Sequence, residues 1–255
     1  MTGGLTPRQK QILSGIIEVH IETRGPVGSR TLADRYPWST SPASLRHEMG
    51  ILEEGGYLTH PHPSAGRMPT DQGYQFYVNH IVKEEPVSSD ALQRMAREMT
   101  GEIRNLEFLM ERASRILSTI AEEIVVATAP RSLPDWERQQ VFIGGSRYIL
   151  QQPEFRDVEK LEHLMTLLEE KSCVLDLLKP QNSETGVHVA IGEKELRKEI
   201  WDCALVSAPY FCRGKTLGSL GILGPRRMPY GRIMGLVHQM AGEVGRRLDR
   251  WGADG

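Results

Sequence analysis

Residues 25–77 constrain the fold most, because they carry the start and stop signals of two short helices and a hairpin in close succession. The first helix is predicted over 29–36, with a serine side chain capping its first turn and Pro37 ending it. The second is predicted over 42–54, capped by Ser41, opened by a proline and stopped by a Gly-Gly pair. The pattern predicts a helix-turn-helix.

The second helix of this pair has two distinct faces when each residue is turned by about 100° around the axis. Leu45, Met49 and Leu52 form one stripe, which we expect to be buried. Gly50 lies on the other side and costs roughly 1 kcal/mol relative to alanine in a helix interior, which close approach to another surface would explain. A plain solvated helix is the alternative. The opposite face carries Ala43, His47, Gly50 and Glu54.

A hairpin is predicted directly after the second helix. Extended runs at 58–60 and 68–70 flank a proline-rich loop with one glycine for the turn. We expect Arg67 to meet phosphate or the minor groove from this hairpin, and His62 to hydrogen-bond phosphate. A metal site at His60 and His62 is the rival interpretation, but the three cysteines lie far off and lack paired spacing.

The helix pair and the hairpin together predict a surface that binds double-stranded DNA. Ser44 and His47 are expected to meet base edges or phosphates, and Arg46 a base or a phosphate; an ion pair with a neighbouring glutamate is the alternative for Arg46. The charge signal is weak, since residues 1–83 hold eight Lys and Arg against seven Asp and Glu. The predicted DNA-binding residues are Ser29, Arg30, Ser41, Ser44, Arg46, His47, His62 and Arg67.

Several short sequence motifs resemble those of a known protein family. In the N-terminal part they are PVGSRTL at 26–32, LEEGGYL at 52–58 and PSAGRMPTDQGYQFYV at 63–78. Farther along they are QPEF at 152–155, APY at 208–210 and LGPRRMPY at 223–230. On these phrases, which span both ends of the chain, the sequence resembles the HrcA family of heat-inducible transcription repressors.

The resemblance implies a winged-helix N-terminus, a GAF-like C-terminal domain with an inserted dimerising segment, and repression of chaperone operons through an inverted-repeat operator called CIRCE. It further implies a homodimer and the GroEL chaperonin as a partner. HrcA proteins ordinarily carry a long stretch where this chain has only residues 130–140, so a shortened C-terminal domain is expected. Leu45 and His47 stand where the family more usually shows Ile and Asn.

Residues 89–124 read as one long helix whose apolar residues recur at steps that alternate between four and three. This spacing has the period of about 3.5 residues found in coiled coils. A dimerisation seam is therefore predicted, and an inverted repeat would need such a two-fold pairing. A helix packed on its own domain is the equal alternative. The predicted seam residues are Met99, Ile103, Leu106, Met110, Leu117 and Ile120.

From residue 124 onward the chain reads as short strands and helices. Strands are predicted over 124–129, 140–144, 173–178, 187–191, 204–208 and 217–223, before a closing helix over 230–250. The glycines of 217–224 lack the spacing of a dinucleotide loop and belong to a strand. The predicted fold is α+β, with an N-terminal winged helix-turn-helix at 1–85, a long connecting helix at 86–125 and a reduced GAF-like domain at 126–255.

Composition limits the remaining options. No apolar run approaches the ~18 residues that span a membrane, the N-terminus has no signal-peptide layout, and three unpatterned cysteines fit a reducing cytoplasm. No catalytic cluster is recognisable, so we expect neither an enzyme nor a cofactor or metal. Two other functions remain open: a GAF-type regulator that responds to a small molecule, and a degenerate paralogue that acts through protein partners.

Overall fold

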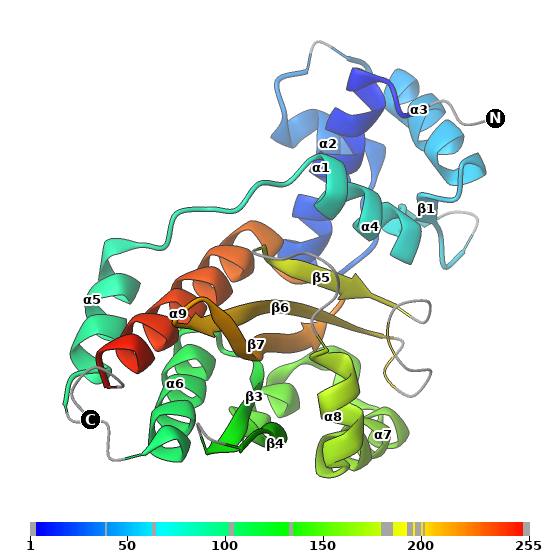
Figure 1. The fold of residues 1–255 in the computed structure, drawn as a ribbon. Helices are drawn as coiled ribbons and strands as arrows, with labels where there is room; N and C mark the ends of the chain where they lie inside the picture. The colour runs from blue at the N-terminus through cyan, green and yellow to red at the C-terminus, as the bar shows by residue number, and fades with distance from the viewer. Residues whose placement is uncertain are drawn as a thin grey trace. The chain divides into compact units, whose positions relative to one another are not determined.

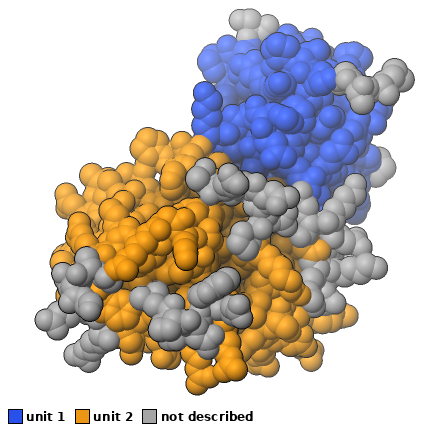
Figure 2. All heavy atoms as spheres, viewed as in Figure 1, with its two compact units in different colours: residues 1–83, 226–229 blue, residues 84–225, 230–255 orange. Residues whose placement is uncertain are grey.

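The chain forms two compact units in a computed structural model that describes residues 4–38, 40–62, 65–101, 105–132, 135–179, 186–192, 196, 200 and 202–251. The N-terminal unit comprises residues 1–83 with 226–229, and the C-terminal unit comprises residues 84–225 with 230–255 (Figure 2). The connection 226–229 therefore belongs to the N-terminal unit, although the predicted boundary assigned it to the C-terminal domain.

The described residues of the N-terminal unit form four helices and one two-stranded hairpin. Its elements are α1 (Pro7–Thr23), α2 (Ser29–Arg35), α3 (Pro42–Glu54), β1 (Leu58–Thr59), β2 (Met68–Pro69) and α4 (Asp71–His80) (Figure 1). Side-chain caps begin three of the helices: Thr6 accepts from the Gln9 amide, Ser41 from the Ser44 amide and Thr70 from the Gly73 amide. These short-range bonds confirm the predicted second helix.

One capping prediction is wrong. Ser29 is not the N-cap of α2; that position is held by Gly28, which offers no side chain, and Ser29 is buried at 8% exposure as the first helical residue. The helix also ends one residue earlier than predicted, at Arg35. Gly28 has the extended backbone of an N-cap, with φ −85° and ψ 150°, whereas Ser29 already belongs to the helix.

A shared apolar core holds the N-terminal unit together. The core is built from Ile12, Leu13, Ile16, Ile17, Leu32, Leu45, Met49, Leu52, Leu58, Tyr74 and Tyr77, all at 7% exposure or less. The buried stripe predicted for α3 is thereby confirmed. The two tyrosines of α4 are core residues, and their spacing of three places them on one face of the helix.

The predicted long helix over 89–124 is wrong, because the chain forms two helices there. They are α5 (Ser89–Glu98) and α6 (Leu106–Ala121), and the sheet begins at Ile124. Gly101 between them has a left-handed φ of 114°, which favours glycine and ends helical geometry. The Asn105 side chain then caps α6 by accepting a hydrogen bond from the Phe108 amide at 2.7 Å.

The predicted seam residues are already buried inside one chain. Met99, Leu106, Met110, Leu117 and Ile120 have exposures of 1%, 5%, 0%, 0% and 9%, while Ile103 lies outside the described residues. Helix α6 packs against β3 (Ile124–Ser132), β4 (Asp135–Gly144) and α9 (Tyr230–Trp251) of its own unit. A seam between subunits would need exposed apolar side chains, so these five do not form one. The apolar period instead reflects the alternative, packing on the chain's own domain.

A five-stranded antiparallel sheet forms the centre of the C-terminal unit. Its strands are β3 (Ile124–Ser132), β4 (Asp135–Gly144), β5 (His188–Ile191), β6 (Cys203–Cys212) and β7 (Lys215–Pro225), in the order β4-β3-β7-β6-β5. In the register, Val126 stands opposite Ile143 on β4 and Gly221 on β7. Of residues 130–140, expected as a connection, 130–132 belong to β3 and 135–140 to β4, and these two strands pair with each other.

Helices cover the sheet, with α6 and α9 (Tyr230–Trp251) packed against each other and on its strands. A second cluster joins Ile124 and Val126 to residues of η1 (Ser146–Gln151), η2 (Pro153–Arg156), α7 (Val158–Glu169) and α8 (Lys171–Leu177). Because side chains alternate along a strand, this cluster lies on one face and α6 on the other (Figure 1). Helices and antiparallel sheets confirm the α+β class.

The strand predicted over 173–178 is wrong, because this segment is α8. Val174 and Leu178 lie one helical turn apart and are both buried in the core cluster. A short apolar run does not by itself distinguish a strand from a buried helix. No helix in the described ranges is long and apolar enough to cross a membrane.

Candidate nucleic-acid interface

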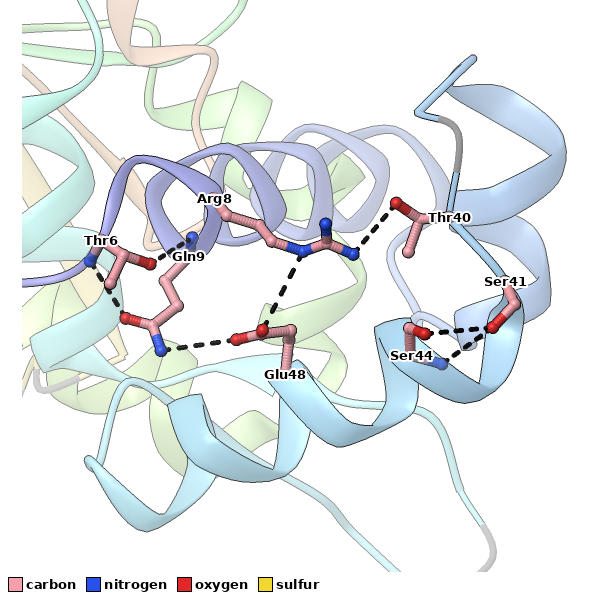
Figure 3. A network of polar contacts seen from close by, with 7 residues as sticks. All are labelled: Thr6, Arg8, Gln9, Thr40, Ser41, Ser44 and Glu48. Atoms are coloured by element: carbon pink, nitrogen blue, oxygen red, sulfur yellow. Dashed lines mark hydrogen bonds and ion pairs between the residues drawn. The ribbon is translucent and has the colours of Figure 1, made fainter.

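The orientation of α3 is set by its inner face and by one glutamate. Leu45, Met49 and Leu52 pack into the core, and Glu48 turns towards the start of α1 (Figure 3). There its carboxylate accepts a hydrogen bond from the Gln9 side chain at 3.4 Å and lies 3.9 Å from the Arg8 guanidinium. The opposite face of α3 therefore points away from the unit.

The outward face of α3 is exposed and has room for another molecule. Arg46 and His47 are exposed there. Gly50 lies on the same side, and no described heavy atom would come within 4 Å of a Cβ added to it. The fold therefore gives no packing reason for a glycine at this helical position, where it costs roughly 1 kcal/mol. Close approach by a second molecule gives one.

The first turn of α3 is organised by two serines. The Ser41 hydroxyl accepts from the Ser44 amide at 3.2 Å, and the two hydroxyl oxygens lie 3.1 Å apart (Figure 3). Both residues are exposed. Ser41 thus serves first as the helix cap, and Ser44 presents a hydroxyl whose position is constrained by that cap.

A cavity of about 570 Å³ lies beside this face. It is bounded by the start of α2, by α3 and by the returning side of the hairpin. Three arginines line it, Arg30, Arg46 and Arg67, together with the buried Ser29 and the backbone of Gly66. The fold therefore gathers four of the predicted DNA-binding residues around one hollow.

The three arginines of this cavity differ in their pairing. Within the described residues, Arg30 and Arg46 have neither an ion pair nor a side-chain hydrogen bond, so the alternative of an internal ion pair for Arg46 is wrong. Arg67 instead pairs with Glu53 at 2.8 Å. Two guanidinium groups at this cavity are thus available to an anion, and the third is neutralised by the chain.

Arg67 is therefore not the free hairpin cation that the sequence suggested. Its side chain is only 20% exposed, and its Nη1 also donates to the carbonyl oxygen of Ala65 at 3.3 Å. Its backbone pairs with Val27 through two hydrogen bonds of 2.8 and 2.9 Å. Arg67 lies at the base of the hairpin rather than at its tip, which explains why its charge is used internally.

The sequence predicted that Gly66 serves the turn of the hairpin. In the structure it has a packing role instead. A Cβ at this position would lie 2.5–2.8 Å from backbone atoms of Val27. A side chain there would push the hairpin away from the segment that leads into α2. Residues 63 and 64 of the loop lie outside the described residues, and His62 is exposed beside them.

Glu53 is the site residue that sequence reasoning missed. One of its carboxylate oxygens contacts Nδ1 of His60 and the other contacts Arg67. His60 is thus engaged with a carboxylate. Over the described part of the chain, no group of three or more His, Cys, Asp or Glu side chains is arranged to hold a metal ion.

Comparisons with known proteins identify relatives along most of the chain. It is 27% identical over 339 positions to the heat-inducible transcription repressor HrcA of Pelotomaculum thermopropionicum, covering 96% of this chain and 97% of the relative. For the HrcA of Natranaerobius thermophilus the identity is 29%, with 95% and 97% covered. A crystal structure of a hypothetical protein shares the fold, with a TM-score of 0.76 and 18% identity over 97% of this chain and 99% of that one.

The relatives are longer than this chain. Since the chain has 255 residues, at least 84 of the 339 positions aligned with the Pelotomaculum protein hold residues of that protein alone. The chain is thus shorter than this relative. The model of the HrcA protein C-terminal domain matches residues 75–234, which is more than half of the chain. The chain therefore belongs to the HrcA family of heat-inducible transcription repressors.

Proposed function

We propose that the N-terminal unit is a winged helix that binds double-stranded DNA. Helix α3 enters the major groove as the recognition helix, and the β1–β2 hairpin acts as the wing. The observation that carries the proposal is the open outer face of α3 beside a cavity with two unpaired arginines. Arg30 and Arg46 meet phosphates or a base, and His47 meets base edges.

The proposed contacts of the remaining predicted residues follow from their positions. Ser44 donates its hydroxyl to a phosphate or base edge, while Ser41 acts through the cap that holds it. His62 is exposed on the hairpin and hydrogen-bonds phosphate. Ser29 contributes through the backbone at the start of α2, because its side chain is buried.

We further propose that the chain acts as a homodimer on an inverted repeat of the CIRCE type that controls chaperone operons. A two-fold operator calls for a two-fold protein. The pairing surface lies outside the buried residues of α6, on a C-terminal unit that we regard as a reduced GAF-like domain. The sheet with helices on its two faces supports that assignment. By resemblance, the GroEL chaperonin is a further proposed partner, and we expect the chain to act in the cytoplasm, where its DNA lies.

The proposal is tested by fluorescence anisotropy of the full chain with an inverted-repeat duplex and with a scrambled duplex, across a salt series. We expect tighter binding to the inverted repeat at every salt concentration. We also expect affinity to fall as salt rises, because phosphate contacts release counterions. Equal affinity for the two duplexes would contradict operator recognition, and absence of binding to both would contradict DNA binding.

A further inference from the structure

We propose that Glu53 is a positioning residue for DNA recognition: its carboxylate joins the last turn of α3 to both sides of the hairpin and sets the angle between them. The inference rests on the proposed function, since it concerns how α3 and the hairpin meet one duplex. Glu53 itself touches no DNA in this proposal.

The contacts of Glu53 reach the two sides of the hairpin separately. His60, which contacts one oxygen, directly follows β1. Arg67, which lies 2.8 Å from the other oxygen, directly precedes β2. Arg67 also exchanges two backbone hydrogen bonds with Val27, in the segment that leads into α2. The Glu53 carboxylate thus joins α3 to the hairpin, and the Arg67 backbone joins the hairpin to the segment that leads into α2.

The hairpin needs such a link because its own pairing is minimal. Each strand has two residues, and the register contains only Leu58 opposite Pro69 and Thr59 opposite Met68. Proline donates no backbone hydrogen bond, and a two-stranded hairpin is marginally stable at best in water. Side-chain contacts at the base of the hairpin therefore help to set its direction relative to α3, together with the backbone hydrogen bonds that join Arg67 to Val27 and Thr70 to Tyr57.

Because Glu53 is charged, the direction in which DNA affinity changes when the charge is removed tests the inference. Glu53 is an anion on a unit that is proposed to bind a polyanion, so electrostatics alone predicts tighter binding when its charge is removed. Positioning predicts weaker binding, because the hairpin loses its direction. Glu54 is the matched control: it is the adjacent glutamate, it is exposed, and among the described residues it has no side-chain partner.

The experiment compares Glu53→Gln and Glu54→Gln with the unchanged chain, in two measurements. In anisotropy with the inverted-repeat duplex, Glu53→Gln is expected to bind about tenfold more weakly, and Glu54→Gln as well as or better than the unchanged chain. In hydrogen exchange without DNA, the amides of Val27 and Arg67 are expected to exchange faster in Glu53→Gln alone. Amides of α1 serve as the reference for global stability.

A double variant tests whether Glu53 acts through Arg67. If the pair works as one link, Glu53→Gln with Arg67→Gln binds no more weakly than the weaker single variant. Glu53→Gln that binds as Glu54→Gln does, with unchanged exchange at Val27 and Arg67, would overturn the inference and leave the proposed function intact. If the unchanged chain itself does not prefer the inverted repeat, the proposed function fails, while the exchange measurement still decides whether Glu53 holds the hairpin.

Discussion

The aromatic rings of Tyr36 and Trp38 stack face to face, with centroids 4.5 Å apart and planes inclined by 8°. The Tyr36 hydroxyl donates to Glu18 of α1 at 2.7 Å, and partial burial together with this bond raises the pKa of Tyr36 to about 12. The segment that follows α2 is thereby fastened to α1. Gly15 of α1 lies against both rings and leaves space for them.

Gly15→Ala is expected to destabilise the N-terminal unit. The added Cβ would lie 2.6 Å from the Trp38 ring and 3.0 Å from the Tyr36 ring. Overpacking of this kind typically costs about 1–3 kcal/mol, which outweighs the gain of roughly 1 kcal/mol in helix propensity. Urea unfolding measures the change. A variant as stable as the unchanged chain would show that the ring stack gives way easily.

Gly50→Ala is expected to stabilise the N-terminal unit and to weaken DNA binding. The added methyl meets no described atom of the chain, so the helix gains up to about 1 kcal/mol in stability. The same methyl obstructs close approach of DNA, and affinity for the inverted-repeat duplex falls. Unfolding and anisotropy on one preparation measure both effects. Unchanged affinity would mean that DNA does not approach α3 at this residue.

Arg30→Ala and Arg46→Ala are each expected to reduce the dependence of binding on salt. A cation that neutralises one phosphate contributes about 0.9 to the slope of log affinity against log salt, so each variant should lower the slope by about that amount. Arg35→Ala is the control, because Arg35 already pairs with Glu22 at 2.6 Å. If all three variants keep the slope of the unchanged chain, neither cavity arginine contacts a phosphate.

Leu117→Ala is expected to destabilise the C-terminal unit without changing the oligomeric state of the folded protein. Leu117 has 0% exposure within one chain, and truncation of a buried leucine costs about 2–5 kcal/mol. Leu92→Ala, at 37% exposure on α5, should cost far less. Unfolding together with sedimentation distinguishes the two roles. If the Leu117→Ala variant is folded but no longer forms dimers, α6 does take part in pairing between subunits.

Features that depend on residues a few positions apart can be predicted from the order of the residues. The caps at Thr6, Ser41 and Thr70 each use a side chain and an amide three residues later, so their chemistry is visible in the order of the residues. The buried stripe of α3 follows in the same way from helical spacing. In addition, short motifs at both ends of the chain indicated that its relatives are HrcA proteins.

Features that depend on partners distant in the chain become visible only in the folded protein. Arg67 could have met phosphate or any carboxylate, and the folded hairpin brings it to Glu53, fourteen residues away. The apolar period of α6 suits a partner subunit as well as its own sheet, and in the folded unit α6 packs on β3, β4 and α9. Periodicity specifies which face of a helix is apolar but not what covers it, because many surfaces satisfy the same burial.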